Sequence, residues 1–135
     1  LNAFKANVEK EYQTRPIKDK TDLQKDRWGG KAEKKDCWLS ASVESDINTG
    51  FYRLLIKVSP LTTEKNIGNQ IAFFLHDTFP KEIVYVNSNA AGEAILMLNA
   101  YEAFTVGAYL EDGTDLELDL NNVPGYPKGF YWGKK

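Results

Sequence analysis

The chain has 135 residues, 42% of them hydrophobic and 27% charged, a composition that suits one globular domain with a sizeable core. Its 17 basic and 19 acidic residues give a formal net charge of −2, which provides no field that would attract nucleic acid or an anionic membrane. We therefore expect neither a nucleic-acid partner nor direct membrane contact from this chain.

The single cysteine, Cys37, cannot form an internal disulfide, which suits a reducing compartment, so the expected location is cytoplasmic. No apolar segment approaches the roughly twenty residues that span a bilayer, and the N-terminus lacks the apolar core of a signal peptide. Because the chain begins with leucine rather than methionine, we expect it to be a fragment of a longer protein that carries other modules.

Residues 1–26 are rich in Lys, Asp, Glu, Gln and Asn. Within them Phe4, Val8 and Tyr12 recur at helical spacing and predict a short amphipathic helix. Pro16 and the charge run over 18–26 argue against a long helix and predict a polar linker instead. We therefore divide the chain into an N-terminal extension or linker over 1–26 and one domain over 27–135.

From Cys37 onward the hydrophobic period changes to two, which is typical of half-buried strands. An Asp-Gly pair at 112–113 separates two alternating runs and is a strong hairpin signal. About seven to eight short strands favour an all-β, immunoglobulin-like antiparallel β-sandwich over a parallel α/β fold. The expected strands cover residues 37–43, 51–58, 71–76, 82–86, 94–98, 104–110 and 115–120.

A candidate site follows the apolar run over 70–75. Pro80 cannot donate to a central ladder, so the strand should stop near it and leave His76, Thr78 and Phe79 at the rim of a sheet. A second aromatic pair, Tyr101 and Phe104, opens another predicted strand whose end could lie beside the first. Together these five residues predict a ligand-binding rim.

The stretch Leu-His-Asp-Thr-Phe-Pro over 75–80, followed by Ala-Tyr-Glu-Ala-Phe over 100–104, resembles the YEATS domain pattern. Further motifs resemble the prokaryotic branch of that family, and together they cover roughly residues 27 to 132. They are Arg-Trp-Gly-Gly-Lys over 27–31, Phe-Thr-Val-Gly-Ala over 104–108, Asp-Gly-Thr over 112–114, Leu-Glu-Leu-Asp-Leu over 116–120 and Pro-Lys-x-Phe over 127–130.

The resemblance implies a non-catalytic reader of a modified peptide or small ligand, with a sensor or adaptor role in signalling or defence. In the eukaryotic relatives two aromatic rings sandwich the acyl group of an acylated lysine, and this implies that Phe79 and Tyr101 are those rings. Thr78 would supply the hydroxyl, Phe104 a wall, and His76 would orient the loop or contact the ligand's amide. The chain departs from the pattern at Lys34, where those readers carry an aromatic residue, and at Ala100, where glycine is common; the lysine would alter the mouth of the pocket.

Other classes of function remain as alternatives. A docking sandwich would bind another protein through an exposed edge strand or through a surface of Trp28, Tyr131 and Trp132, with Phe79, Tyr101 and Phe104 plugging a closed rim. An open slot between Phe79 and Tyr101 would favour the ligand, and direct packing of the two rings would favour the plug.

An enzyme is disfavoured because His76 is the only histidine and Cys37, next to Trp38, is typical of a core position. One cysteine and one histidine also fall short of the usual four ligands of structural zinc. The carboxylates of Asp115, Glu117 and Asp119 share one strand face and could hold calcium or act as an acid/base pair, but a solvated outer face is the favoured interpretation. We expect no catalytic residue, metal or cofactor.

Overall fold

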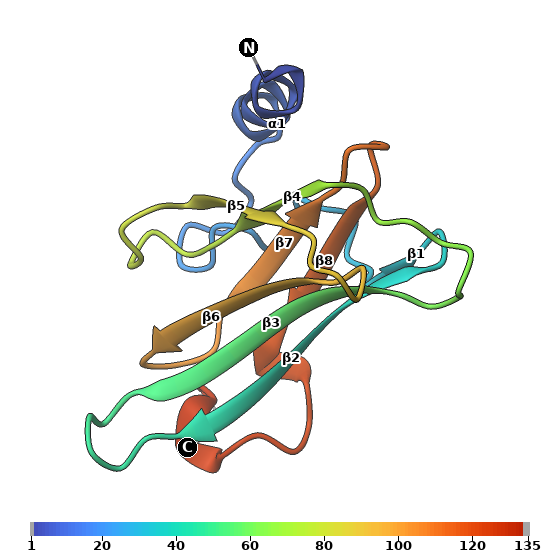
Figure 1. The fold of residues 1–135 in the computed structure, drawn as a ribbon. Helices are drawn as coiled ribbons and strands as arrows, with labels where there is room; N and C mark the ends of the chain where they lie inside the picture. Colours follow the sequence, from blue (N-terminus) through green and yellow to red (C-terminus); the bar gives the residue numbers. More distant parts are fainter. Residues whose placement is uncertain (1, 134–135) are drawn as a thin grey trace.

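The computed structural model describes residues 2–133, which form one helix, two short 3-10 helices and eight strands (Figure 1). The strands build two antiparallel sheets, one with the order β1-β2-β3-β6 and the other with the order β5-β4-β7-β8. This is the predicted β-sandwich with an N-terminal helix. The elements are α1 (Ala3–Thr14), β1 (Glu33–Lys34), β2 (Cys37–Ser45), β3 (Tyr52–Pro60), β4 (Gln70–Phe74), β5 (Ile83–Asn87), β6 (Ala94–Ala100), β7 (Thr105–Tyr109), β8 (Asp115–Asp119), η1 (Leu120–Asn122) and η2 (Lys128–Phe130).

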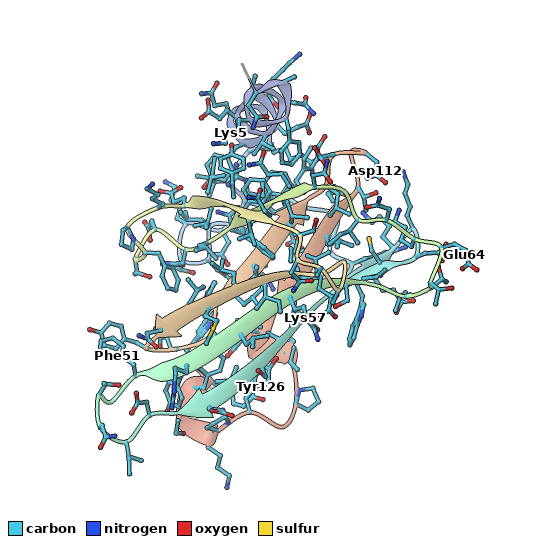
Figure 2. All side chains as sticks on the ribbon, in the orientation of Figure 1. Lys5, Phe51, Lys57, Glu64, Asp112 and Tyr126 are labelled. Carbon is cyan, nitrogen blue, oxygen red and sulfur yellow. The ribbon has the colours of Figure 1, made fainter. Side chains whose placement is uncertain are left out.

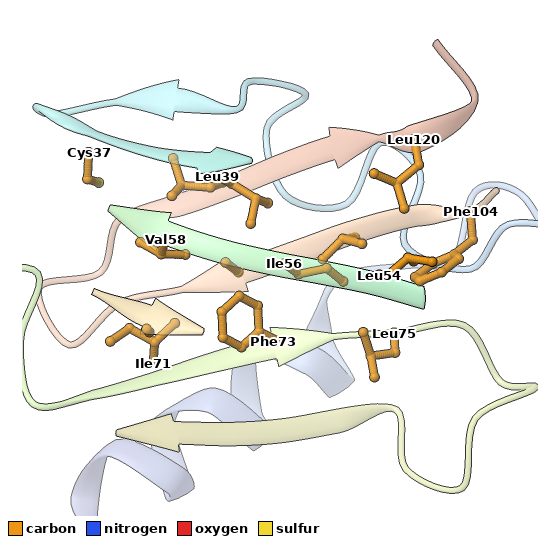
Figure 3. Close-up of a cluster of buried hydrophobic side chains, with 14 of the residues drawn as sticks. Cys37, Leu39, Leu54, Ile56, Val58, Ile71, Phe73, Leu75, Phe104 and Leu120 are labelled. Atoms are coloured by element: carbon orange, nitrogen blue, oxygen red, sulfur yellow. The ribbon is translucent and has the colours of Figure 1, made fainter. Parts of the chain in front are cut away.

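The core lies between the two sheets (Figure 3). Alternation along each strand turns every second side chain inward, as Leu39 on β2 and Ile56 on β3 illustrate. Each fully buried aliphatic or aromatic side chain contributes roughly 1.5–3 kcal/mol of hydrophobic stabilisation. The cluster continues through Cys37, Leu54, Val58, Ile71, Phe73, Leu75, Phe104, Val106, Leu110, Leu116, Leu120 and Phe130.

The predicted strands are present with small differences at their ends. The main difference concerns the strand expected over 71–76: β4 ends at Phe74, so His76 lies in the loop that follows. Leu75 still donates its backbone N–H to the Glu82 carbonyl, which closes the ladder just before that loop. The two-residue strand β1 was not predicted, because two residues carry no period.

Helix α1 covers the outer face of the β5-β4-β7-β8 sheet (Figure 1). The Asn2 side chain caps it by accepting from the Lys5 N–H, and Val8 is fully buried against the sheet. The Trp28 ring stacks on Phe74 with centroids 3.8 Å apart and planes 2° apart. Trp28 is therefore a buried core residue, and the prediction that it belongs to an exposed docking surface is wrong.

Residues 15–31 run along the same sheet and are fixed by buried polar bonds. The Glu117 carboxylate on β8 accepts from the backbone N–H groups of Asp26, Trp28 and Gly30. The neighbouring carboxylates form ion pairs: Asp115 with Arg15 and Lys34, and Asp119 with Lys25. The prediction of a solvated acidic face on this strand is therefore wrong, because the N-terminal segment covers it. The division of the chain at 26/27 stays a prediction.

Candidate functional site

A cavity of about 370 Å³ opens at one end of the sandwich, where the loop from β4 to β5 meets the loop from β6 to β7. The structure brings all five sequence-predicted residues together around it; that they bind a ligand stays a prediction. Figure 2 shows Phe51 at this end of the molecule and Glu64 at the other. The lining residues are Thr21, Phe51, His76, Thr78, Phe79, Pro80, Asn99, Ala100, Tyr101, Glu102, Ala103, Phe104 and Trp132.

The His76 ring connects two parts of the cavity wall. Its Nε2 lies 3.0 Å from the Thr21 carbonyl oxygen, which can only accept, so Nε2 carries a proton. Its Nδ1 accepts from the Thr78 backbone N–H at 3.2 Å and lies 3.3 Å from the Thr78 hydroxyl. A carboxylate oxygen of Asp77 also lies 2.9 Å from Nδ1, so this nitrogen faces both a donor, the Thr78 N–H, and an acceptor.

The aromatic residues form separate walls. Phe79 packs on Phe104 with ring centroids 5.1 Å apart and planes inclined by 58°. Tyr101 packs on Phe51 with centroids 4.4 Å apart, and its side chain is 71% exposed. Phe79 and Tyr101 thus have different ring partners and both line the cavity. Whether an open slot separates these two rings stays a prediction.

Local sequence motifs do not reveal several of the lining residues, among them Thr21, Phe51 and Trp132. Each lies far along the chain from the two recognised loops, and the topology of the sandwich brings it to this end. Trp132 is held by two hydrogen bonds with the Asn121 side chain. The backbone N–H of Trp132 donates to Oδ1 at 3.0 Å, and its backbone carbonyl accepts from Nδ2 at 3.2 Å. Trp132 is 39% exposed, as the docking alternative expects, and it also forms part of the cavity wall.

Lys34 does not affect this cavity. It pairs with Asp115 at the start of β8, whereas the cavity lies beside the start of β7, at the other end of this antiparallel pair. The expectation that a lysine at this position alters the mouth of the pocket is therefore wrong.

The cavity suits a ligand that carries no negative charge and has a flat apolar part. Within residues 2–133, no Lys or Arg side chain is among its lining residues whereas Glu102 is, so a carboxylate or phosphate would have no cation to pair with. The aromatic faces offer stacking, and His76, Thr78 and Asn99 offer hydrogen bonds. The described part of the chain also holds no group of three or more His, Cys, Asp or Glu side chains that could bind a metal ion.

Cys37 is fully buried at the far end of β2, where its thiol donates to the Lys34 carbonyl. Burial raises the pKa of this thiol, which keeps it protonated and weakly nucleophilic.

Residues 2–133 contain no helix that is both long and apolar enough to cross a bilayer.

The fold is a β-sandwich with a cavity between two loops that join strands at one end of the sandwich. The model of the prokaryotic YEATS domain matches residues 52–121, which is more than half of the chain, and the chain belongs to this family. YEATS domains are reader modules and are generally non-catalytic. No curated protein and no solved structure matches the chain. The matched region contains the five predicted site residues and excludes Thr21, Phe51 and Trp132.

Proposed function

We propose that this domain is a non-catalytic reader that binds an acylated lysine side chain of a peptide, or a small ligand of the same shape, between Phe79 and Tyr101. The observation that carries the proposal is that these two rings line one cavity while each packs on a different partner. A planar acyl-amide could enter between them and stack on both faces. Stacking of this kind contributes roughly 0.5–1.5 kcal/mol for each ring pair beyond the area that it buries.

The Thr78 hydroxyl would fix the amide of the ligand. Nδ1 of His76 lies 3.3 Å from the Thr78 hydroxyl and accepts from the Thr78 backbone N–H, and the hydroxyl can donate its proton to the same nitrogen. The hydroxyl oxygen then keeps its lone pairs for the amide N–H of the acyl-lysine. His76 therefore acts by orienting Thr78 and its loop.

A planar acyl-lysine fits the aromatic walls of the cavity better than an unmodified lysine does. An ammonium ion entering the cavity would lose much of its hydration, and cation–π attraction or the carboxylate of Glu102, which also lines the cavity, would have to replace it. Acylation removes that charge and adds a planar group. In a longer protein, such binding would make the domain a sensor or adaptor in signalling or defence, and we place that role in the cytoplasm.

The proposal is tested by titrating the isotope-labelled chain with three otherwise identical peptides that carry crotonyl-lysine, acetyl-lysine or unmodified lysine. We expect saturable shifts of the Thr78, Tyr101 and Phe104 amides with the acylated peptides only. Tyr101→Ala should weaken binding at least about tenfold, because it removes one of the two stacking faces.

Trp38→Ala is the control, because Trp38 is also an exposed aromatic residue and lies on the outer face of β2, away from the cavity. It should leave the affinity unchanged. Absence of saturable shifts with every peptide, or equal binding of acylated and unmodified lysine, would contradict the proposal.

A further inference from the structure

The two loops that form the cavity are joined to each other by one short piece of the N-terminal segment. The Asp22 side chain is 3% exposed, and its two carboxylate oxygens accept from Thr105: the backbone N–H at 2.8 Å and the hydroxyl at 2.7 Å. Thr105 is the first residue of β7 and directly follows Phe104, the last residue of the loop that leaves β6. The preceding residue, Thr21, accepts from Nε2 of His76 in the other loop. Adjacent residues of one chain segment therefore hold both loops.

The segment is itself preorganised for this contact. The Asp19 carboxylate accepts from the Thr21 backbone N–H at 2.9 Å and from its hydroxyl at 2.6 Å. The Asp22 N–H donates to the Asp19 carbonyl at 3.2 Å, which closes a turn. Thr21 and Asp22 consequently have little freedom to follow one loop away from the other.

We propose that Asp22 is a positioning residue of the binding cavity, because its carboxylate on Thr105 and the neighbouring Thr21 carbonyl on His76 fix the separation of the two loops. The separation of the loops sets the width of the slot between Phe79 and Tyr101. The expected effect of Asp22 on ligand affinity therefore rests on the proposed function. The binding site then extends beyond the family-matched residues 52–121 into the N-terminal segment.

Glu117 provides a matched control for a purely structural role. Its carboxylate is also buried, at 6% exposure, and it also holds the N-terminal segment, through the backbone N–H groups of Asp26, Trp28 and Gly30. None of these four residues lines the cavity. Loss of the Glu117 carboxylate should therefore destabilise the fold as loss of Asp22 does, without changing the distance between the loops.

The test compares the affinities of Asp22→Ala, Asp22→Asn and Glu117→Ala for the crotonyl-lysine peptide, at a temperature where each variant is folded. Asp22→Ala should bind about tenfold more weakly than the wild type. Asp22→Asn should restore binding to within about twofold, because its amide oxygen accepts from the Thr105 N–H and its NH₂ group donates to the Thr105 hydroxyl. Glu117→Ala should lower Tm while leaving the affinity within about twofold. Where Asp22→Ala fails to fold, Thr105→Val takes its place, since it removes only the hydroxyl bond.

A second measurement, amide hydrogen exchange, needs no ligand. Asp22→Ala should accelerate exchange over residues 76–79 as well as over 103–105, whereas Glu117→Ala should not act selectively on these two loops. If Asp22→Ala binds as tightly as the wild type, or loses affinity only in proportion to Glu117→Ala, the positioning role is overturned and the reader function stands. If the wild type binds no acylated peptide, the reader function fails, and coupled exchange in the two loops still supports the connection through Asp22.

Discussion

Gly107 illustrates how a single missing side chain allows the outer layer to form. It lies in β7, directly beneath the Trp28 ring, and a Cβ added there would approach Nε1 of that ring to 2.7 Å and Cγ to 2.8 Å. The ring cannot move away freely, because Phe74 stacks on it at 3.8 Å and the Arg15 guanidinium lies 4.4 Å from its centre. The glycine is therefore required by space rather than by its backbone angles.

Gly107→Ala should lower the free energy of unfolding by about 1–3 kcal/mol, as measured by urea denaturation, although alanine restricts the unfolded chain more than glycine does. The double variant Gly107→Ala/Trp28→Phe should lose less than the sum of the two single variants, because the smaller ring leaves room for the added methyl group. Strict additivity would show that the overlap with Trp28 is not the cause.

At the scale of elements, helix α1 is held by packing rather than by its own helical propensity. Val8 is fully buried between the helix and the sheet, and Tyr12 stacks on Phe74 with centroids 5.4 Å apart. Helices of this length are marginal in water on their own. The helix and the outer face of the sheet therefore depend on each other.

Val8→Ala gives a test whose sign distinguishes a docked helix from a free one. Alanine has the higher helix propensity, so in an undocked helix the change would be neutral or slightly stabilising. In the docked helix it should lower the free energy of unfolding by roughly 1–2.5 kcal/mol, because two buried methyl groups are lost. The exposed neighbour Lys10, changed to Ala, is the control and should have little effect in the same denaturation experiment.

The elements themselves were largely predictable, because the alternation that signals a strand is local and survives in the sandwich. The position of His76, Thr78 and Phe79 at the rim was also predictable from the sequence, because one contiguous motif contains all three residues. The packing of the N-terminal segment was not predictable. Asp22 and Glu117 are residue types typical of a solvated surface, and their partners Thr105 and Asp26 lie 83 and 91 residues away along the chain. Burial of a polar group depends on such distant partners, which hydrophobic periodicity does not reveal.

At the scale of the whole molecule, the carboxylates of β8 fasten the first third of the chain to the sandwich. The Asp115 carboxylate forms an ion pair with the guanidinium of Arg15, which follows α1, at an N–O distance of 2.8 Å. It forms a second ion pair with Lys34 on β1. Burial, the largest single influence, raises the pKa of Asp115, but hydrogen bonds from Lys34 and Arg15 and the charges of these residues together outweigh it. The pKa of Asp115 is therefore lower in the folded protein than its ordinary value.

The lowered pKa of Asp115 determines how the free energy of unfolding depends on pH. Because the folded-state pKa lies below the unfolded value of about 3.9, the contribution of Asp115 is fully present well above that value and is lost as the pH falls through the folded pKa. Asp115→Asn should therefore be less stable than the wild type at pH 7 by about 1 kcal/mol, since the three side chains are partly exposed and water weakens the pairs. The difference should shrink as the pH falls below about 4.

Urea denaturation of both proteins between pH 7 and pH 3 measures this convergence. The exposed carboxylate of Glu44 on β2, changed to Gln, is the control and should leave the pH dependence of the wild type unaltered. A constant difference between Asp115→Asn and the wild type across this range would show that the amide is disfavoured for its shape and not for its missing charge. Convergence, by contrast, would show that a charged carboxylate on the last strand secures the N-terminal segment, from which Thr21 and Asp22 reach the cavity loops.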